Sequence, residues 1–107
     1  MEQLSRIKVG PTVVPVYKDE TLEGLFGCFE NYPTQRILVK CQSQQQQDMT
    51  VLHELLHAVS DMYGLRLSES QVRVLEQVVT QLVADNHPLV AAWCSRIASC
   101  PTSTSET

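Results

Sequence analysis

The run from Asp48 to Tyr63 predicts a helix, and it carries the segment that most constrains the fold, His53-Glu54-Leu55-Leu56-His57. Histidines four residues apart lie on one face of a helix, with Cβ atoms about 6 Å apart. Their two imidazoles can therefore reach one Zn²⁺ at about 2.0–2.1 Å each. Glu54 is rotated about 100° around the helix from His53. Its carboxylate would then lie beside the ion, where it can take a proton from an attacking water.

Apolar residues around the two histidines repeat at helical spacing. They predict a buried stripe made of Leu52, Leu55, Leu56, Val59, Met62 and Tyr63. His53 and His57 border this stripe, so we expect both side chains to be half-buried. A half-buried histidine pair without a metal would need other hydrogen-bond partners. The motif in this context therefore favours metal binding over a chance match.

Extended segments precede this helix. Arg6 to Tyr17 is rich in β-formers and is interrupted by Gly10-Pro11. Pro15 indicates an edge strand or irregular pairing, because proline cannot donate to a sheet ladder. Leu25 to Glu30 and Arg36 to Cys41 are two further strands, which we expect to form a hairpin.

The boundaries of the helices follow from capping residues. Gln42 to Gln47 is interpreted as a polar linker, either a solvated connector or a frayed helix start, with Asp48 as the N-cap of the first helix and Gly64 as its stop. Ser68 and Gln71 form a capping-box pattern that opens a second helix ending near Asp85. The residues expected to form the core face of this helix are Val72, Leu75, Val78, Val79 and Leu82. A third helix is expected over Leu89 to Ala98.

The fold class predicted by these elements is α+β, with a small antiparallel sheet followed by the H-E-x-x-H helix and two further helices. The length of 107 residues suits one domain, which we place over residues 1–100. The tail over residues 101–107 is rich in Ser and Thr and is expected to be disordered.

Charge and composition exclude several classes of protein. The net charge is −4 and no basic patch stands out, so a nucleic-acid partner is not expected. No apolar run is long enough for a membrane span, and the N-terminal residues lack a signal peptide, so we expect a cytoplasmic protein. The cysteines Cys28, Cys41, Cys94 and Cys100 form no C-x-x-C pair. They are expected to be free and mostly buried thiols, with a catalytic cysteine as the less favoured alternative.

A zinc site needs a third protein ligand, and four residues are candidates. Asp61 lies about 12 Å along the helix from His53, too far to share the ion easily. His87 follows the second helix and is expected to be a surface histidine. Glu69 and Glu76 lie two turns apart on one face of the second helix. Geometry alone leaves both glutamates open as the third ligand.

The segment Thr50 to Ala58, Thr-Val-Leu-His-Glu-Leu-Leu-His-Ala, resembles the active-site helix of zincins of the ImmA/IrrE type. The similarity extends over roughly residues 6 to 85 and is greatest to small members carried by phages or prophages. It implies an α+β zincin fold and zinc-dependent peptide hydrolysis. It also implies Glu69 as the third ligand, matching the acid of an E-x-x-A-N-x-F-A-like helix, although the Ala, Asn and Phe are missing here. Metzincins fit poorly, because Ser60 stands where their glycine would be.

The resemblance and the motif together predict a zinc metallopeptidase acting on a peptide or protein substrate. His53, His57 and Glu69 would hold Zn²⁺, and Glu54 would act as the general base. The strand from Arg36 to Cys41 is expected to border the cleft and pair with an extended peptide. Tyr17, Tyr32 and Tyr63 are the candidates for stabilising the oxyanion. The alternatives are a zinc-binding protein-interaction module, such as a phage or regulatory factor, and a helical domain with a chance motif.

Overall fold

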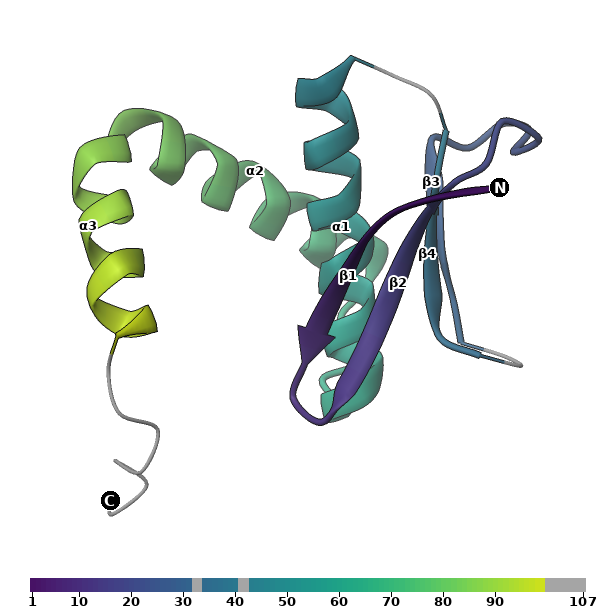
Figure 1. Ribbon diagram of the computed structural model, residues 1–107, viewed down its shortest axis with the longest axis horizontal. Helices are drawn as coiled ribbons and strands as arrows, with labels where there is room; N and C mark the ends of the chain where they lie inside the picture. Colours follow the sequence, from purple (N-terminus) through teal and green to yellow (C-terminus); the bar gives the residue numbers. More distant parts are fainter. Residues whose placement is uncertain (32–33, 41–42, 100–107) are drawn as a thin grey trace. The chain divides into compact units, whose positions relative to one another are not determined.

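The computed structural model describes residues 1–31, 34–40 and 43–99. The fold is α+β, with four strands followed by three helices (Figure 1). The elements are β1 (Glu2–Val9), β2 (Thr12–Lys18), β3 (Gly27–Glu30), β4 (Arg36–Val39), α1 (Gln44–Tyr63), α2 (Glu69–Asp85) and α3 (His87–Ala98). The chain divides into two compact units, Met1–Glu76 and a second that begins at Gln77, so that the boundary falls inside α2. The tail predicted over residues 101–107 lies outside the described residues.

The first two strands form a hairpin around Gly10-Pro11. Val9 is paired with Thr12, which leaves these two residues as the turn. Gly10 has a φ of 57°, a left-handed conformation that glycine adopts without steric cost. Pro11 supplies a fixed negative φ at the next position. The break predicted at Gly10-Pro11 is therefore the two-residue turn of a β-hairpin.

The sheet is mixed, which corrects the prediction of an antiparallel sheet. Its strand order is β1-β2-β4-β3, and β4 runs parallel to β2. The chain leaves β2, crosses to the position of β3 and returns along β4, which is inserted between the two. The apolar run Ile37-Leu38-Val39 explains this order, because these residues are at most 2% exposed and suit a strand covered on both faces.

The hairpin predicted between the last two strands is confirmed. Gly27 is paired with Val39, and Glu30 is paired with Arg36, whose Nε donates to the Glu30 carboxylate at 2.6 Å. Pro15 lies in β2, which is an interior strand, so the edge-strand alternative is wrong. The residue pairs with Arg6 of β1, whereas pairing of β2 with β4 begins only at Val16. The missing N–H of Pro15 therefore interrupts no bond to β4.

Helix α1 starts earlier than predicted, because the glutamines belong to it. Ser43, not Asp48, is the N-cap, and its hydroxyl accepts the N–H of Gln46 at 3.3 Å. Gln44 donates to the side chains of Gln47 and Asp48, one turn further along the helix. These hydrogen bonds join side chains of neighbouring turns and stabilise the start of the helix. The polar composition of the run does not reveal them.

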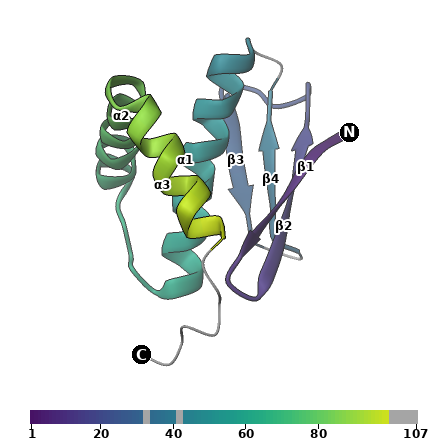
Figure 2. The same cartoon turned by 60° about the vertical axis from the view of Figure 1, so that its left-hand side comes forward.

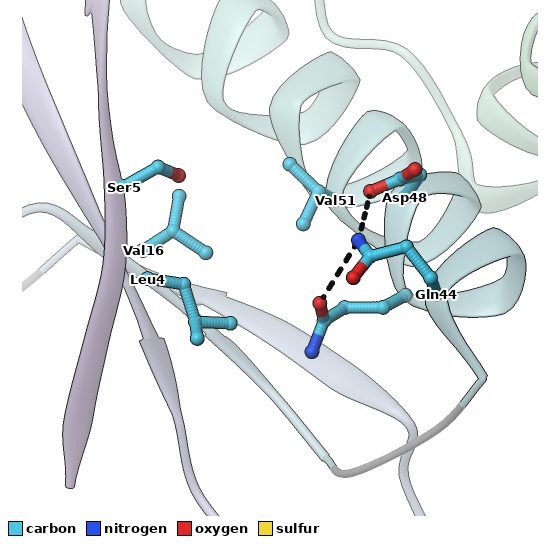
Figure 3. Close-up of a pocket in the computed structure, with 7 residues that line it drawn as sticks. Leu4, Ser5, Val16, Gln44, Asp48 and Val51 are labelled. Carbon is cyan, nitrogen blue, oxygen red and sulfur yellow. Dashed lines mark hydrogen bonds between the residues drawn. The ribbon is translucent and has the colours of Figure 1, made fainter.

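A pocket of about 350 Å³ lies between this first turn of α1 and the sheet. Figure 3 shows Gln44 and Asp48 of the helix facing Leu4, Ser5 and Val16 of the sheet. The residues that line the pocket include neither the two histidines nor Glu69. This pocket is therefore separate from the residues predicted to bind metal.

The core of the first unit lies between the sheet and α1, which runs beside β3 in Figure 2. Its fully buried residues are Val14, Val16, Ile37 and Val39. The helix residues packed on them are Val51, Leu55 and Met62, at positions that share one helical face. The predicted stripe is therefore correct in part. Leu55 and Met62 pack on the core, Leu52, Leu56 and Val59 are half-buried, and Tyr63, the last residue of the helix, is 57% exposed.

Gly27 allows β3 to approach α1 closely. A Cβ at this position would lie 2.5 Å from Cγ2 of Thr50 and 3.0 Å from the Leu38 carbonyl oxygen. Such contacts are too short for carbon atoms, and the β-branched Thr50 has little rotamer freedom on a helix. Gly27 is therefore a requirement of the packing between strand and helix.

We expect Gly27→Ala to lower the free energy of unfolding by about 1–3 kcal/mol, the usual cost of overpacking. Chemical denaturation of the full chain measures this change. The matched control is Gly27→Ala combined with Thr50→Ser, which removes Cγ2 and keeps the hydroxyl. The double variant should recover at least half of the loss. A single variant as stable as wild type would contradict the packing argument.

The turn between α1 and α2 is held by a residue that the sequence analysis missed. Ser60 is 7% exposed, and its hydroxyl accepts the N–H of Leu67 at 2.8 Å. Its carbonyl accepts the N–H groups of Gly64 and Leu65. The stop predicted at Gly64 is confirmed by its φ of 66°.

The capping box predicted for α2 is also confirmed. The Gln71 side chain accepts the N–H of Ser68 at 2.8 Å, and the Ser68 hydroxyl accepts the N–H of Gln71 at 3.1 Å. Two N–H groups that a helix start leaves unpaired are satisfied in this way. The hydrogen bonds of Ser60 hold the turn, and those of Ser68 and Gln71 hold the cap. Together they fix the position of Glu69, which directly follows Ser68.

The predicted core face of α2 is correct at Val72, which is fully buried, and wrong over most of its length. Leu75, Val78 and Leu82 are 38%, 50% and 53% exposed. From Gln77 onward the helix belongs to the second unit, where two short helices have too little surface to enclose an apolar face. Helix α3 begins at His87, two residues earlier than predicted, with Pro88 in its first turn. None of the described helices is long and apolar enough to cross a bilayer.

Candidate metal centre

The two histidines of the motif lie side by side on α1. Their ring centroids are 5.0 Å apart, and the ring planes meet at 63°. The side chains of His53 and His57 are 15% and 27% exposed, which agrees with the half-buried state expected for them. Both rings are therefore largely shielded from water.

Glu69, the first residue of α2, bridges the two histidines. Its Oε1 lies 2.8 Å from Nε2 of His57, and its Oε2 lies 3.0 Å from Nε2 of His53. One carboxylate therefore draws the same nitrogen of both rings toward a single point. Arg73, one turn further along α2, contacts the same carboxylate at 3.3 Å.

Glu76 also reaches the histidines, but at a different atom. Its Oε1 lies 2.9 Å from Nδ1 of His53, on the opposite side of the ring from Nε2. Its side chain is 17% exposed, compared with 49% for Glu69. The structure thus brings both candidate glutamates to the motif, with Glu69 on the Nε2 side and Glu76 on the Nδ1 side.

The donor set of His53, His57 and Glu69 fits a zinc ion. One ligand atom from each of the three residues lies within 4.8 Å of the others. Two imidazole nitrogens and one carboxylate are the protein ligands of many catalytic zinc sites, where a fourth position stays open. Of the other candidates, Asp61 is exposed on α1, and His87 belongs to the second unit.

The surroundings of Glu69 favour its charged form. Burial opposes ionisation, but the hydrogen bond with His57 and the charges of His53, His57 and Arg73 outweigh it, so the pKa of Glu69 is lowered. A carboxylate must be deprotonated to bind a metal. The same contacts that orient Glu69 therefore also hold it in the protonation state that a ligand needs.

Glu54 lies on the side of α1 that faces β3. It is 8% exposed, and burial raises the pKa of its carboxyl, against the opposing charges of His53 and His57. The backbone N–H of Phe29 donates a hydrogen bond to its carboxylate. A raised pKa brings a glutamate closer to the range in which it acts as a general base.

The tyrosines proposed for the oxyanion receive little support. Tyr63 lies beside Gly10, ten residues beyond His53 and therefore about 15 Å further along the helix. Tyr17 is a β2 residue paired with Leu38, and Tyr32 lies outside the described residues. The cysteine prediction is wrong in part, since Cys28 is half-buried and Cys94 is exposed. Cys41 and Cys100 lie outside the described residues.

We expect Glu69→Gln to weaken zinc binding by more than about 100-fold, beyond the 10–100-fold typical of residues that only support a ligand. Glu76→Gln should have a much smaller effect, because it changes a group on the far side of the His53 ring. Competition with a chelating dye measures both affinities. The opposite ranking would make Glu76 the third ligand.

Comparison with known proteins gave no match to a protein-family model, to a curated protein or to a solved structure.

Proposed function

We propose that the chain is a zinc-dependent metallopeptidase similar to small members of the ImmA/IrrE type. The observation that supports this proposal best is the convergence of His53, His57 and Glu69. Their contacting atoms come from two helices and meet within 4.8 Å. The Glu69 carboxylate of α2 faces the same nitrogen of both rings, which is the arrangement of a two-histidine, one-carboxylate metal site.

The residues around this donor set divide the chemistry of peptide hydrolysis between them. When bound, zinc would act as a Lewis acid, polarising a peptide carbonyl and lowering the pKa of water. Glu54 would take a proton from the attacking water and pass it to the leaving amine. Its burial keeps bulk water away, and the N–H of Phe29 holds its carboxylate in place.

The strand that we propose to pair with a substrate differs from the one expected from the sequence. β4 has β2 on one side and β3 on the other, so it cannot pair with a peptide. β3 has one neighbour in the described sheet, and its Phe29 contacts Glu54. We therefore place an extended substrate along β3, the edge strand nearest the general base.

A metal-dependence experiment tests the proposed function. Wild-type chain is incubated with a broad peptide library, and cleavage is read by mass spectrometry. We expect cleavage with one equivalent of zinc, its loss after removal of zinc by a chelator, and its return when zinc is added back. Cleavage that is indifferent to the chelator would contradict a zinc mechanism.

A zinc-binding interaction module is the second candidate, and exposed apolar residues favour it. Val78, Leu82 and Trp93 of the second unit are each about half exposed (50%, 53% and 49%). Surfaces of this kind often contact another protein. Zinc bound in the library experiment without any cleavage would favour this candidate over the peptidase.

A further inference from the structure

The contact between Glu76 and His53 concerns Nδ1 of His53, the nitrogen of this ring that the proposed zinc site does not use. Nε2 of His53 faces Glu69, whereas Nδ1 lies 2.9 Å from Oε1 of Glu76. An imidazole that binds a metal through Nε2 keeps its proton on Nδ1 and can donate it. A carboxylate at hydrogen-bond distance is a strong acceptor for that proton.

We propose that Glu76 is a positioning residue that selects the metal-binding tautomer of His53. The proposal rests on the proposed zinc site and adds a residue to it. By accepting the Nδ1 proton, Glu76 leaves the lone pair of Nε2 directed at the point shared with His57 and Glu69. It also fixes the rotation of the ring, because a hydrogen bond and a metal bond on opposite nitrogens define its plane.

Burial and sequence position both support this role. Glu76 is 17% exposed, whereas the ligand Glu69 is 49% exposed. The two residues lie two turns apart on α2, so one helix face delivers a carboxylate to each side of the His53 ring. Both residues belong to the same continuous helix, which begins directly after the Ser68 cap.

Among the described contacts, the two histidines differ in the number of carboxylates that contact their rings. His57 contacts Glu69 through Nε2. His53 is held from both sides. The proposal therefore predicts an asymmetric site, in which the loss of Glu76 affects the His53 ring and leaves the His57 ring largely unchanged.

The test uses the full chain with Glu76→Ala, Glu76→Gln and, as a matched control in the same turn, Gln77→Ala. Zinc affinity is measured by dye competition, and ¹⁵N spectra of the zinc-loaded chain report the proton on each imidazole. We expect Glu76→Ala to weaken zinc binding about 10–100-fold and to remove the protected Nδ1–H signal of His53. Glu76→Gln, whose amide oxygen still accepts a hydrogen bond, should restore most of the affinity and the signal. Gln77→Ala should behave as wild type.

Three results would overturn the proposal. Zinc affinity unchanged in Glu76→Ala would show that the contact does not matter for binding. Loss of affinity in Glu76→Gln as large as in Glu69→Gln would make Glu76 a ligand. A His53 proton found on Nε2 in the loaded chain would reverse the assigned tautomer. A wild-type chain that binds no zinc would instead remove the proposed site itself, which distinguishes the two failures.

Discussion

Protein carrying Glu54→Gln is expected to keep its fold and its zinc while cleaving peptides about 10²–10⁴-fold more slowly than wild type. A carboxamide has nearly the shape of the carboxylate but cannot take up a proton. Its oxygen can still accept the N–H of Phe29, and a neutral amide costs less to bury than a charged carboxylate. The free energy of unfolding should therefore stay equal to that of wild type or rise slightly.

The measurement is the rate of cleavage of the best library peptide, together with zinc content and chemical denaturation. The matched control is Glu23→Gln, which makes the same change of charge at an exposed position between β2 and β3. The control should cleave at the wild-type rate. Equal cleavage by Glu54→Gln and wild type would mean that another group, or a contaminating peptidase, performs the reaction.

The second large effect is expected from His53→Ala, which should reduce bound zinc from about one per chain to nearly none. Its ring is the one that contacts both Glu69 and Glu76, so its removal also takes one α1 contact from each carboxylate, although Glu69 keeps its contact with His57. Bound metal stabilises a folded chain by mass action, by about 2.7 kcal/mol when its free concentration is 100 times Kd. The variant should lose this stabilisation.

Elemental analysis and thermal unfolding with and without added zinc check this expectation. His87→Ala is the matched control, because His87 is exposed and belongs to the second unit. Zinc should raise the unfolding temperature of wild type and of the control, and leave that of His53→Ala unchanged. A full equivalent of zinc retained by His53→Ala would place the metal elsewhere.

Local signals in the sequence predicted the end of α1 and the start of α2 correctly, whereas the N-cap predicted at Asp48 is wrong because Ser43 caps α1. Gly64 and the Ser68–Gln71 box are short-range patterns, and each is confirmed by its own hydrogen bonds. The glutamine run left a connector and a frayed helix start open, because a polar run carries no apolar periodicity. Its helical state depends on side-chain bonds between Gln44, Gln47 and Asp48 that composition does not reveal.

Long-range features were harder to predict. The parallel pairing of β2 with β4 depends on where β3 crosses, and nothing local in either strand specifies it. For the same reason the strand from Arg36 to Cys41 was expected to pair with a peptide, although β4 is an interior strand.

The two candidate glutamates could not be ranked from spacing, since residues seven apart share a helix face. The folded structure distinguishes them, because Glu69 contacts Nε2 of His53 and Glu76 contacts Nδ1.

The buried Ser60 gives the turn between the two helices a fixed length. Its hydroxyl and carbonyl hold three N–H groups, so one residue inserted or deleted between Gly64 and Ser68 would break at least one of these bonds or displace the start of α2, and Glu69 with it. Relatives of this chain should therefore keep a spacing of 12 between His57 and the acid. The pattern H-E-x-x-H-x-x-S, seven residues, then S-E-x-Q describes that constraint. It offers a search key for distant homologues that is more selective than the histidine motif.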